Sequence, residues 1–385
     1  MTDLFQTAYD QLLTWCRDRD FAGHDPFDAL NSTVFQATPL ANSRNARFIW
    51  TQLIKRSPID LRPLIRVPAQ RNAKAIALFA LALKNCEAEA QSLLADLLNL
   101  KIDGYSGAAW GYNFDWQSRN FFAPRGTATI VPTAFAARAF VEYGFLETAR
   151  SVCEFILRDL PRPVDTPTEI CFSYTPNDHT QIFNASLLAA EVLASVGKLT
   201  GETELCDVAT RAARYVVNHQ RDDGSWSYGT EPAQSWIDNF HTAYILFSLK
   251  RIIDACPGAG EFQSSLEQGF SYWKSNFFLA EGWPKYYHDD PYPADAHAAA
   301  SAIVTLVECR ELDETSLKTA QDIARWTIQN LRDERGFFYY QRRRFYTIRK
   351  PYMRWTQGWM LYALARLLEA ESLENARLET HARSI

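Results

Sequence analysis

The chain has 385 residues, of which 47% are hydrophobic and 22% are charged, and its formal net charge is −5 at pH 7. These values are ordinary for a globular protein, and they argue against a strongly basic nucleic-acid-binding protein. No apolar run approaches about 18 residues, so we expect no membrane span.

The N-terminus and the cysteines indicate the compartment. The first residues lack the basic segment followed by an apolar segment that marks a secretory signal. The seven cysteines are scattered, and none has the spacing of a metal-binding motif. We therefore expect a reduced, cytoplasmic protein. No cofactor is expected and no metal ligand is assigned, while the binding of a metal stays open.

Helical patterns dominate along the chain. Amphipathic patterns predict helices over residues 3–19 and 44–55, and a helical hairpin over residues 72–84 and 87–101. Two kinds of helix then alternate. The more charged helices, expected to face solvent, cover residues 146–160, 202–220, 261–278 and 312–331. The helices between them, such as residues 183–196 and 294–307, are rich in alanine and serine and should be buried. Brief hairpins are expected only near residues 226–228 and 337–341.

One unit recurs along the chain. A glycine- and aromatic-rich loop is followed each time by a small-residue apolar helix with a polar residue in its first turn. If Asn184, His241, His297 and Gln357 are equivalent, the copies are 57, 56 and 60 residues apart. A period of this length fits two helices plus their loops.

Repeated helix pairs predict an all-α (α/α)6 toroid, with an open superhelix of the same pairs as the alternative. In this prediction residues 1–385 form one domain. Residues 1–69 close the ring, residues 70–370 form the repeats and residues 371–385 form a tail. In a closed ring the first turns of all inner helices meet at one mouth, where long aromatic loops also lie.

The segment Gln220-Arg-Asp-Asp-Gly-Ser-Trp226 carries a family resemblance. It is similar to the Q-x-x-D-G-S-W motif of terpenoid cyclases and protein prenyltransferase relatives, and of many carbohydrate-active toroids. In those families the segment ends an outer helix and turns the chain, so the resemblance implies the fold more than the chemistry. The acidic Asp-x-Asp-Asp motif of terpenoid cyclases and the Asp-Asp-x-x-Asp motif of prenyl-diphosphate enzymes are absent from the sequence.

Acidic residues and histidines gather at the expected starts of the inner helices. Asp238 and His241 are three residues apart, and Asp295 and His297 two apart. Acidic residues at these positions are also ordinary helix caps. The helix dipole disfavours a charged histidine in a first turn, so these histidines should be neutral and able to accept a proton. The candidate catalytic residues are His241, Asp238, His297, Asp295, Asp115 and Arg354.

Loop aromatics and polar side chains at the mouth supply a candidate sugar-binding surface. Sugar rings stack on aromatic faces, and their hydroxyls bond to carboxylates, amides and guanidinium groups. The candidate substrate-binding residues are Trp110, Tyr112, Trp116, Arg119, Asn184, Trp226, Tyr228, Tyr286, Trp355 and Gln357.

These residues favour acid–base chemistry on a glycan or sugar ligand. Deprotonation of a uronic acid needs a neutralised carboxylate and a histidine or tyrosine base, and toroidal polysaccharide lyases use Asn, His, Tyr and Arg in these roles. We therefore favour a lyase or epimerase over an inverting hydrolase, which needs two carboxylates.

The chain also resembles toroids of bacterial surface-polysaccharide production. The alternatives are an isoprenoid-binding toroid and a non-catalytic scaffold that binds a glycan or peptide. The oligomeric state stays open.

Overall fold

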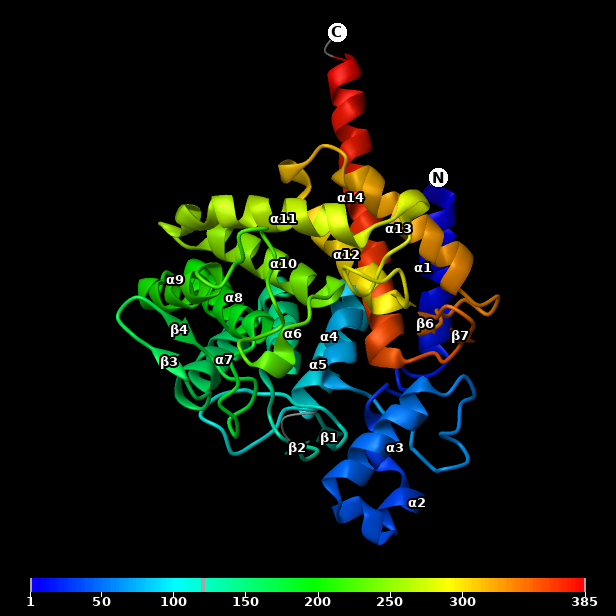
Figure 1. Cartoon of the computed structure of the whole chain (residues 1–385). Coiled ribbons are helices and arrows are strands. Elements are labelled where there is room, and N and C mark those ends of the chain that lie inside the picture. Colours follow the sequence, from blue (N-terminus) through cyan, green and yellow to red (C-terminus); the bar gives the residue numbers. More distant parts are fainter. Residues whose placement is uncertain (1, 119–121, 384–385) are drawn as a thin grey trace.

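The protein is an α/α toroid built from two concentric layers of helices. The computed structural model describes residues 2–118 and 122–383, and within these residues six inner helices are surrounded by six outer helices (Figure 1). The inner helices are α4 (Ala73–Ala82), α6 (Ile130–Glu142), α8 (Phe183–Thr200), α10 (Asn239–Ala255), α12 (Ala296–Glu308) and α14 (Gly358–Arg383). The outer helices are α1 (Thr2–Arg17), α5 (Glu87–Asn99), α7 (Leu146–Arg158), α9 (Thr203–Val217), α11 (Gln263–Phe277) and α13 (Ser316–Leu331).

The ring is closed. Each inner helix packs on the inner helices before and after it, and α4 packs on both α6 and α14. The first helix of the chain, α1, packs on α13 and α14 and so serves as the outer partner of the last inner helix. The predicted toroid is therefore confirmed, and the open superhelix is wrong.

The composition of each layer explains its place. In α12, every residue from Ala296 to Val307 is buried, and the many alanines allow neighbouring helices to approach closely. In α7 only one face is buried, through residues such as Val152 and Phe155, while charged residues occupy the rest. Burial on all sides and burial on one side are the two patterns that distinguish inner from outer helices.

Short two-stranded and three-stranded sheets lie in the loops at one end of the ring. They are β1 (Trp116–Gln117) with β2 (Phe122–Ala123), β3 (Val164–Asp165) with β4 (Ile170–Cys171), and β5 (Ala294–Asp295) with β6 (Gln341–Arg342) and β7 (Thr347–Ile348). Of the two runs predicted to form brief hairpins, residues 337–341 reach β6 only at their last residue. Residues 226–228 belong to none of these strands.

Residues 28–67 form an N-terminal excursion that projects from the ring beside the β1–β2 hairpin (Figure 1). It contains η1 (Asp28–Asn31), α2 (Thr33–Gln36), η2 (Pro39–Asn42) and α3 (Arg44–Arg56). It has a small core of its own, formed by Ala29, Ile54, Ile65 and Val67.

The Q-x-x-D-G-S-W segment has a structural role. The Gln220 amide donates to the carbonyls of Gly224 and Ser265, which ties the end of α9 to α11. Gly224 has φ +87°, a conformation that favours glycine. Trp226 is 1% exposed and its indole N–H donates to the Val216 carbonyl at 2.9 Å. The prediction that Trp226 binds substrate is therefore wrong, because its ring is enclosed between helices.

The C-terminal segment differs from the predicted tail. Helix α14 continues to Arg383 and extends beyond the ring (Figure 1). The segment is rich in alanine, leucine and glutamate and has no glycine or proline after Gly358, so nothing ends the helix earlier. Among the described residues, no helix has both the length and the apolar character needed to cross a bilayer. All seven cysteines are free thiols.

Candidate active site

A cavity of about 430 Å³ opens where the inner helices begin. One residue from the first turn of each inner helix lines it, the last from the π-helical turn η7 (Met353–Gln357) that precedes α14. These residues are Lys74, Val131, Asn184, His241, His297 and Arg354. The repeat thus places six chemically different side chains around one space.

His241 and Asp238 form a hydrogen-bonded pair in the cavity wall. Asp238 is the N-cap of α10 and accepts the His241 backbone N–H at 3.0 Å. Its other oxygen lies 2.6 Å from Nδ1 of His241 and also accepts the Trp236 indole N–H. Because a carboxylate only accepts hydrogen bonds, Nδ1 carries a proton, and in the neutral imidazole Nε2 then holds the lone pair. The His241 side chain is 20% exposed and that of Asp238 1%, so the histidine faces the cavity and the aspartate supports it.

Tyr244 lies one helical turn after His241 and joins two buried bases. Nζ of Lys74 donates to the tyrosine hydroxyl at 2.8 Å, and Nε2 of His297 lies 2.9 Å from the same oxygen. Burial lowers the pKa of Lys74 well below its ordinary range, and nearby Arg354 and Arg138 lower it further. Burial, together with Lys74 and Arg354, also lowers the pKa of His297. Both shifts favour the neutral form of the base.

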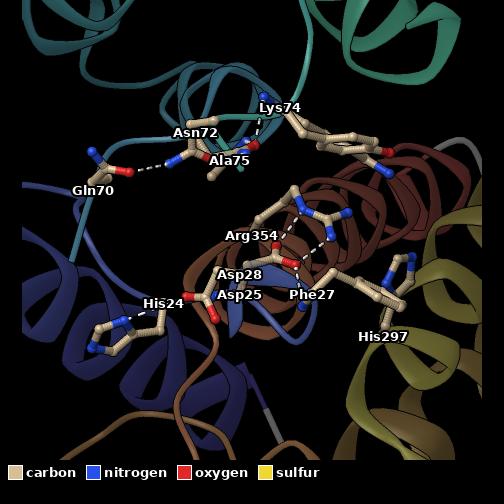
Figure 2. A network of polar contacts seen from close by, with 12 residues as sticks. His24, Asp25, Phe27, Asp28, Gln70, Asn72, Lys74, Ala75, His297 and Arg354 are labelled. Carbon is tan, nitrogen blue, oxygen red and sulfur yellow. Dashed lines mark hydrogen bonds and ion pairs between the residues drawn. The ribbon is translucent and has the colours of Figure 1, made fainter. Parts of the chain in front are cut away.

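Arg354 is fixed by an ion pair with the N-terminal segment. Its Nε and one terminal nitrogen bond to the two oxygens of Asp25 at 2.5 and 2.9 Å. Both side chains are at most 6% exposed. Figure 2 shows this pair with Lys74 and His297, which come from α4 and α12, the inner helices on either side of α14. The pair holds the guanidinium at the cavity wall.

Aromatic side chains form much of the remaining wall. Tyr228 stacks on Trp236 with ring centroids 4.5 Å apart, and Phe240 packs against both cavity histidines. The predicted binding residues that line the cavity are Tyr112, Trp116, Asn184, Tyr228, Tyr286 and Trp355. Such a wall offers ring faces for stacking, with polar groups between them.

Three more predicted residues do not line the cavity, and the substrate contacts assigned to the two that are buried, Trp110 and Gln357, are corrected. Trp110 is fully buried, and its indole donates to the Leu97 carbonyl between helices. Gln357 is also buried, and its side chain bonds to the backbone N–H and carbonyl of Phe338. The π-helical turn places Arg354 at the mouth instead. Asp115 accepts the backbone N–H of Arg125 within its loop. Arg119 lies outside the described residues.

Asp295 lies beneath the cavity and does not line it. It is the N-cap of α12 and accepts hydrogen bonds from the Gln341 amide and the Trp355 indole. Burial raises its pKa to about 6 despite these bonds. We therefore correct its assignment as a group that reaches substrate: it positions the first turn of α12, which carries His297.

Two lysines and one tyrosine at the site are not among the residues predicted from the sequence. Lys74 is the lone charge in the apolar run of α4 and stands at the second helical position, as His297 does in α12. Tyr244 follows His241 by one turn, a spacing that places both on one helix face. These two signals were present in the sequence. Lys55 belongs to the N-terminal excursion, and nothing in the repeat pattern places it at the mouth.

The electrostatics of the cavity favour a negatively charged group. Helix N-termini carry partial positive charge, and six of them converge here. Lys55 of α3 also lines the cavity, with its ammonium 4.1 Å from the Phe27 ring centroid. Burial lowers the pKa of Lys55 to about 8, so it is mostly charged at neutral pH. Asp238 is the sole carboxylate among the described lining residues.

Comparisons with known proteins show the fold and no closer relationship. No family model and no curated protein matches the chain. A cellobiose 2-epimerase from Bacillus thermoamylovorans is similar in structure, with a TM-score of 0.58 and 13% identity, over 80% of this chain and 90% of the epimerase. A sugar epimerase from a ruminal bacterium gives 0.56 and 13%, over 78% and 90%. A GH76 α-mannanase from Bacteroides thetaiotaomicron gives 0.59 and 13%, over 79% and 87%. At this identity the likeness establishes the shared (α/α)6 toroid.

Proposed function

We propose that this protein is a carbohydrate-active enzyme that removes a proton from a sugar carbon, as epimerases, isomerases and lyases do. The observation that carries the proposal is the His241–Asp238 pair in the wall of an aromatic cavity, with Tyr244 one helical turn further along the same helix face. Nε2 of His241 is the general base, and Asp238 fixes the tautomer that leaves its lone pair free. The sugar epimerases among the structural neighbours support this class.

The chemical step uses the two groups together. The C–H bond next to a carbonyl or carboxylate breaks, its proton moves to His241, and the electron pair spreads onto the substrate oxygen. With Nε2–H of His297 donating to the Tyr244 oxygen, the phenolic proton is free to hydrogen-bond that substrate oxygen. A donor aimed at developing charge in a dry site supplies a large part of such catalysis.

Hydrolysis fits the site less well. Inverting and retaining glycosidases both use a pair of carboxyl groups at the scissile bond. Among the described residues that line the cavity, Asp238 has no carboxylate partner, and it is already bonded to His241 and Trp236. The polar groups of the wall likewise disfavour the isoprenoid alternative, which expects a lining of apolar residues alone.

We further propose that the substrate is an acidic sugar or glycan, such as one with a uronic acid, from bacterial polysaccharide metabolism in the cytoplasm. The converging helix N-termini, Lys55 and Arg354 support an anionic group at the mouth. The bacterial sources of the structural neighbours and the seven free thiols support the biological setting. A non-catalytic glycan-binding scaffold is the second candidate, favoured by the extent of the aromatic wall.

The test is a screen of neutral sugars, uronic acids and their oligomers, with product analysis by chromatography and NMR. The proposal expects an epimerised, isomerised or unsaturated product. A new reducing end without such a change would indicate a hydrolase. Binding without any product on the full panel would favour the scaffold.

Tyr244→Phe tests the second catalytic group. Removing one donor to a developing oxyanion costs about 10²–10³-fold in kcat, and we expect a loss in this range with KM little changed. Steady-state kinetics on the substrate from the screen measure it. Tyr143→Phe is the matched control, because that hydroxyl bonds to the Ala80 carbonyl away from the cavity. Equal activities of Tyr244→Phe and the control would remove Tyr244 from the mechanism.

Lys55 gives binding of an acidic substrate a defined pH dependence. Because the pKa of Lys55 is about 8, its charge is present below that pH and is lost above it. KM for an acidic sugar should therefore rise as the pH passes through about 8, while KM for a neutral sugar should not. Lys55→Gln should show the raised KM at all pH values. A wild-type KM that stays flat from pH 7 to 9 for an acidic substrate contradicts this role.

A further inference from the structure

The exposed apolar residues of the protein are concentrated beside the cavity mouth. Six of the described large apolar side chains that are exposed lie in residues 34–64: Val34, Leu40, Ile49, Leu53, Ile59 and Leu64, at 45 to 78% exposure. Within α3 the two faces differ. Phe48, Gln52 and Lys55 line the cavity, while Ile49 and Leu53 point to solvent.

The β6–β7 hairpin adds a second apolar element. Phe345 at its turn is 90% exposed and Tyr346 is 42% exposed. The hairpin lies against the N-terminal excursion, because the Lys350 ammonium donates to the Ile54 carbonyl of α3 at 2.6 Å. We call the exposed side chains of residues 33–66 and 342–350 the apolar–basic surface.

The charge of this surface is opposite to that of the whole chain. Residues 33–66 and 342–350 hold eleven basic residues and one acidic residue, in a chain whose total charge is −5. Arg62 and Lys350 are buried and Lys55 lines the cavity, which leaves eight basic residues and one acidic residue, a net +7, for the surface. Arg44, Arg56, Arg66, Arg344 and Arg349 are exposed. An anionic partner is thus attracted to one side of the molecule and repelled by the rest.

We propose that the apolar–basic surface docks on an anionic lipid bilayer. Basic side chains bind acidic headgroups while exposed isoleucine, leucine and phenylalanine enter the boundary between headgroups and acyl chains, the combination typical of interfacial binding. On a purely polar polyanion, the exposed aliphatic side chains would find no apolar group to contact. A symmetric contact with a second copy would place the same basic surface against itself. The membrane would then lie beside the mouth, whichever reaction the cavity performs.

The experiment is co-sedimentation of the full chain with vesicles. One set contains phosphatidylcholine alone, and the other contains equal parts phosphatidylcholine and phosphatidylglycerol. We expect binding to the anionic vesicles and little to the neutral ones, with affinity falling as salt is raised, since screening weakens surface charge interactions.

Three variants separate the contributions. Ile49→Ser/Leu53→Ser and Phe345→Ser should each weaken binding at least tenfold, and Arg44→Gln/Arg56→Gln should weaken it roughly fivefold per charge removed. The matched control is Leu199→Ser/Leu279→Ser, which removes two exposed leucines elsewhere and should bind as wild type does. All of these side chains are exposed, so melting temperatures should not change.

Several outcomes would overturn the proposal. They are absence of wild-type binding to anionic vesicles, equal losses in the control variant, and equal binding to both vesicle types. A dimer in sedimentation that Ile49→Ser/Leu53→Ser dissociates, without vesicle binding, would assign the surface to self-association. Binding to a soluble polyuronate that these serine variants leave unchanged, without vesicle binding, would assign it to a polyanion.

Discussion

Replacing His241 by glutamine should lower turnover of the sugar substrate by about 10²–10⁴-fold, the usual contribution of a positioned general base. Glutamine keeps a polar side chain of similar size but cannot take up the proton. Because His241 is partly exposed to the cavity and makes its one strong bond to Asp238, the fold should survive. Steady-state kinetics and thermal melting, measured on the same preparation, test both statements.

His219 provides the matched control for this substitution. It lies at the end of α9 outside the cavity, where Nδ1 is 2.7 Å from the Tyr215 carbonyl. His219→Gln should retain turnover near the wild-type level. If His241→Gln is as active as the control, His241 is not the base, and if it fails to fold, the histidine is a structural residue.

Glu191→Gln should lower the free energy of unfolding by about 3–5 kcal/mol, because it removes the carboxylate that is paired with the buried guanidinium of Arg138. Glu191 is 4% exposed and accepts hydrogen bonds from Arg138, Arg251 and Ser248. These groups lie on inner helices away from the catalytic mouth, so the variant tests ring stability directly. Denaturant unfolding measures the loss.

The effect of Glu191→Gln should depend on pH in a defined direction. Burial alone would raise the pKa of Glu191, but Arg138 and Arg251 hold it below its usual range. The charged form therefore stabilises the fold fully above the ordinary pKa of about 4.3, and this stabilisation is lost as the pH falls below it. Glu154→Gln, in a partly exposed cluster with Arg150 and Arg158, should cost at most about 1 kcal/mol. A Glu191→Gln loss no larger than that of Glu154→Gln would contradict the network's role.

The sequence was sufficient for the ring because its signals are local and repeated. Alanine-rich segments such as residues 296–307 are apolar on every side, which only a buried helix accommodates. The 56–57-residue spacing from Asn184 to His241 and His297 placed three first-turn side chains in register. All three line the cavity.

The sequence was insufficient where non-local contacts decide the outcome. Gln357 continued the repeat spacing, but the π-helical turn brings Arg354 to the mouth. Trp110 lies in an aromatic loop typical of stacking surfaces, yet its indole N–H donates to the Leu97 carbonyl between helices. Asp25 and Lys55 reach the site from the N-terminal segment, and no helical period relates them to the repeats.

The most direct test of the account is deuterium incorporation from D2O during turnover, followed by mass spectrometry and NMR on substrate and product. Proton removal by His241 predicts one solvent-derived deuterium on the carbon next to the carbonyl or carboxylate. It appears in the product when the carbon is reprotonated and in recovered substrate when the step reverses. The label should vanish with His241→Gln and persist with His219→Gln. Turnover that cleaves a glycosidic bond and leaves every carbon-bound hydrogen unexchanged would contradict the account.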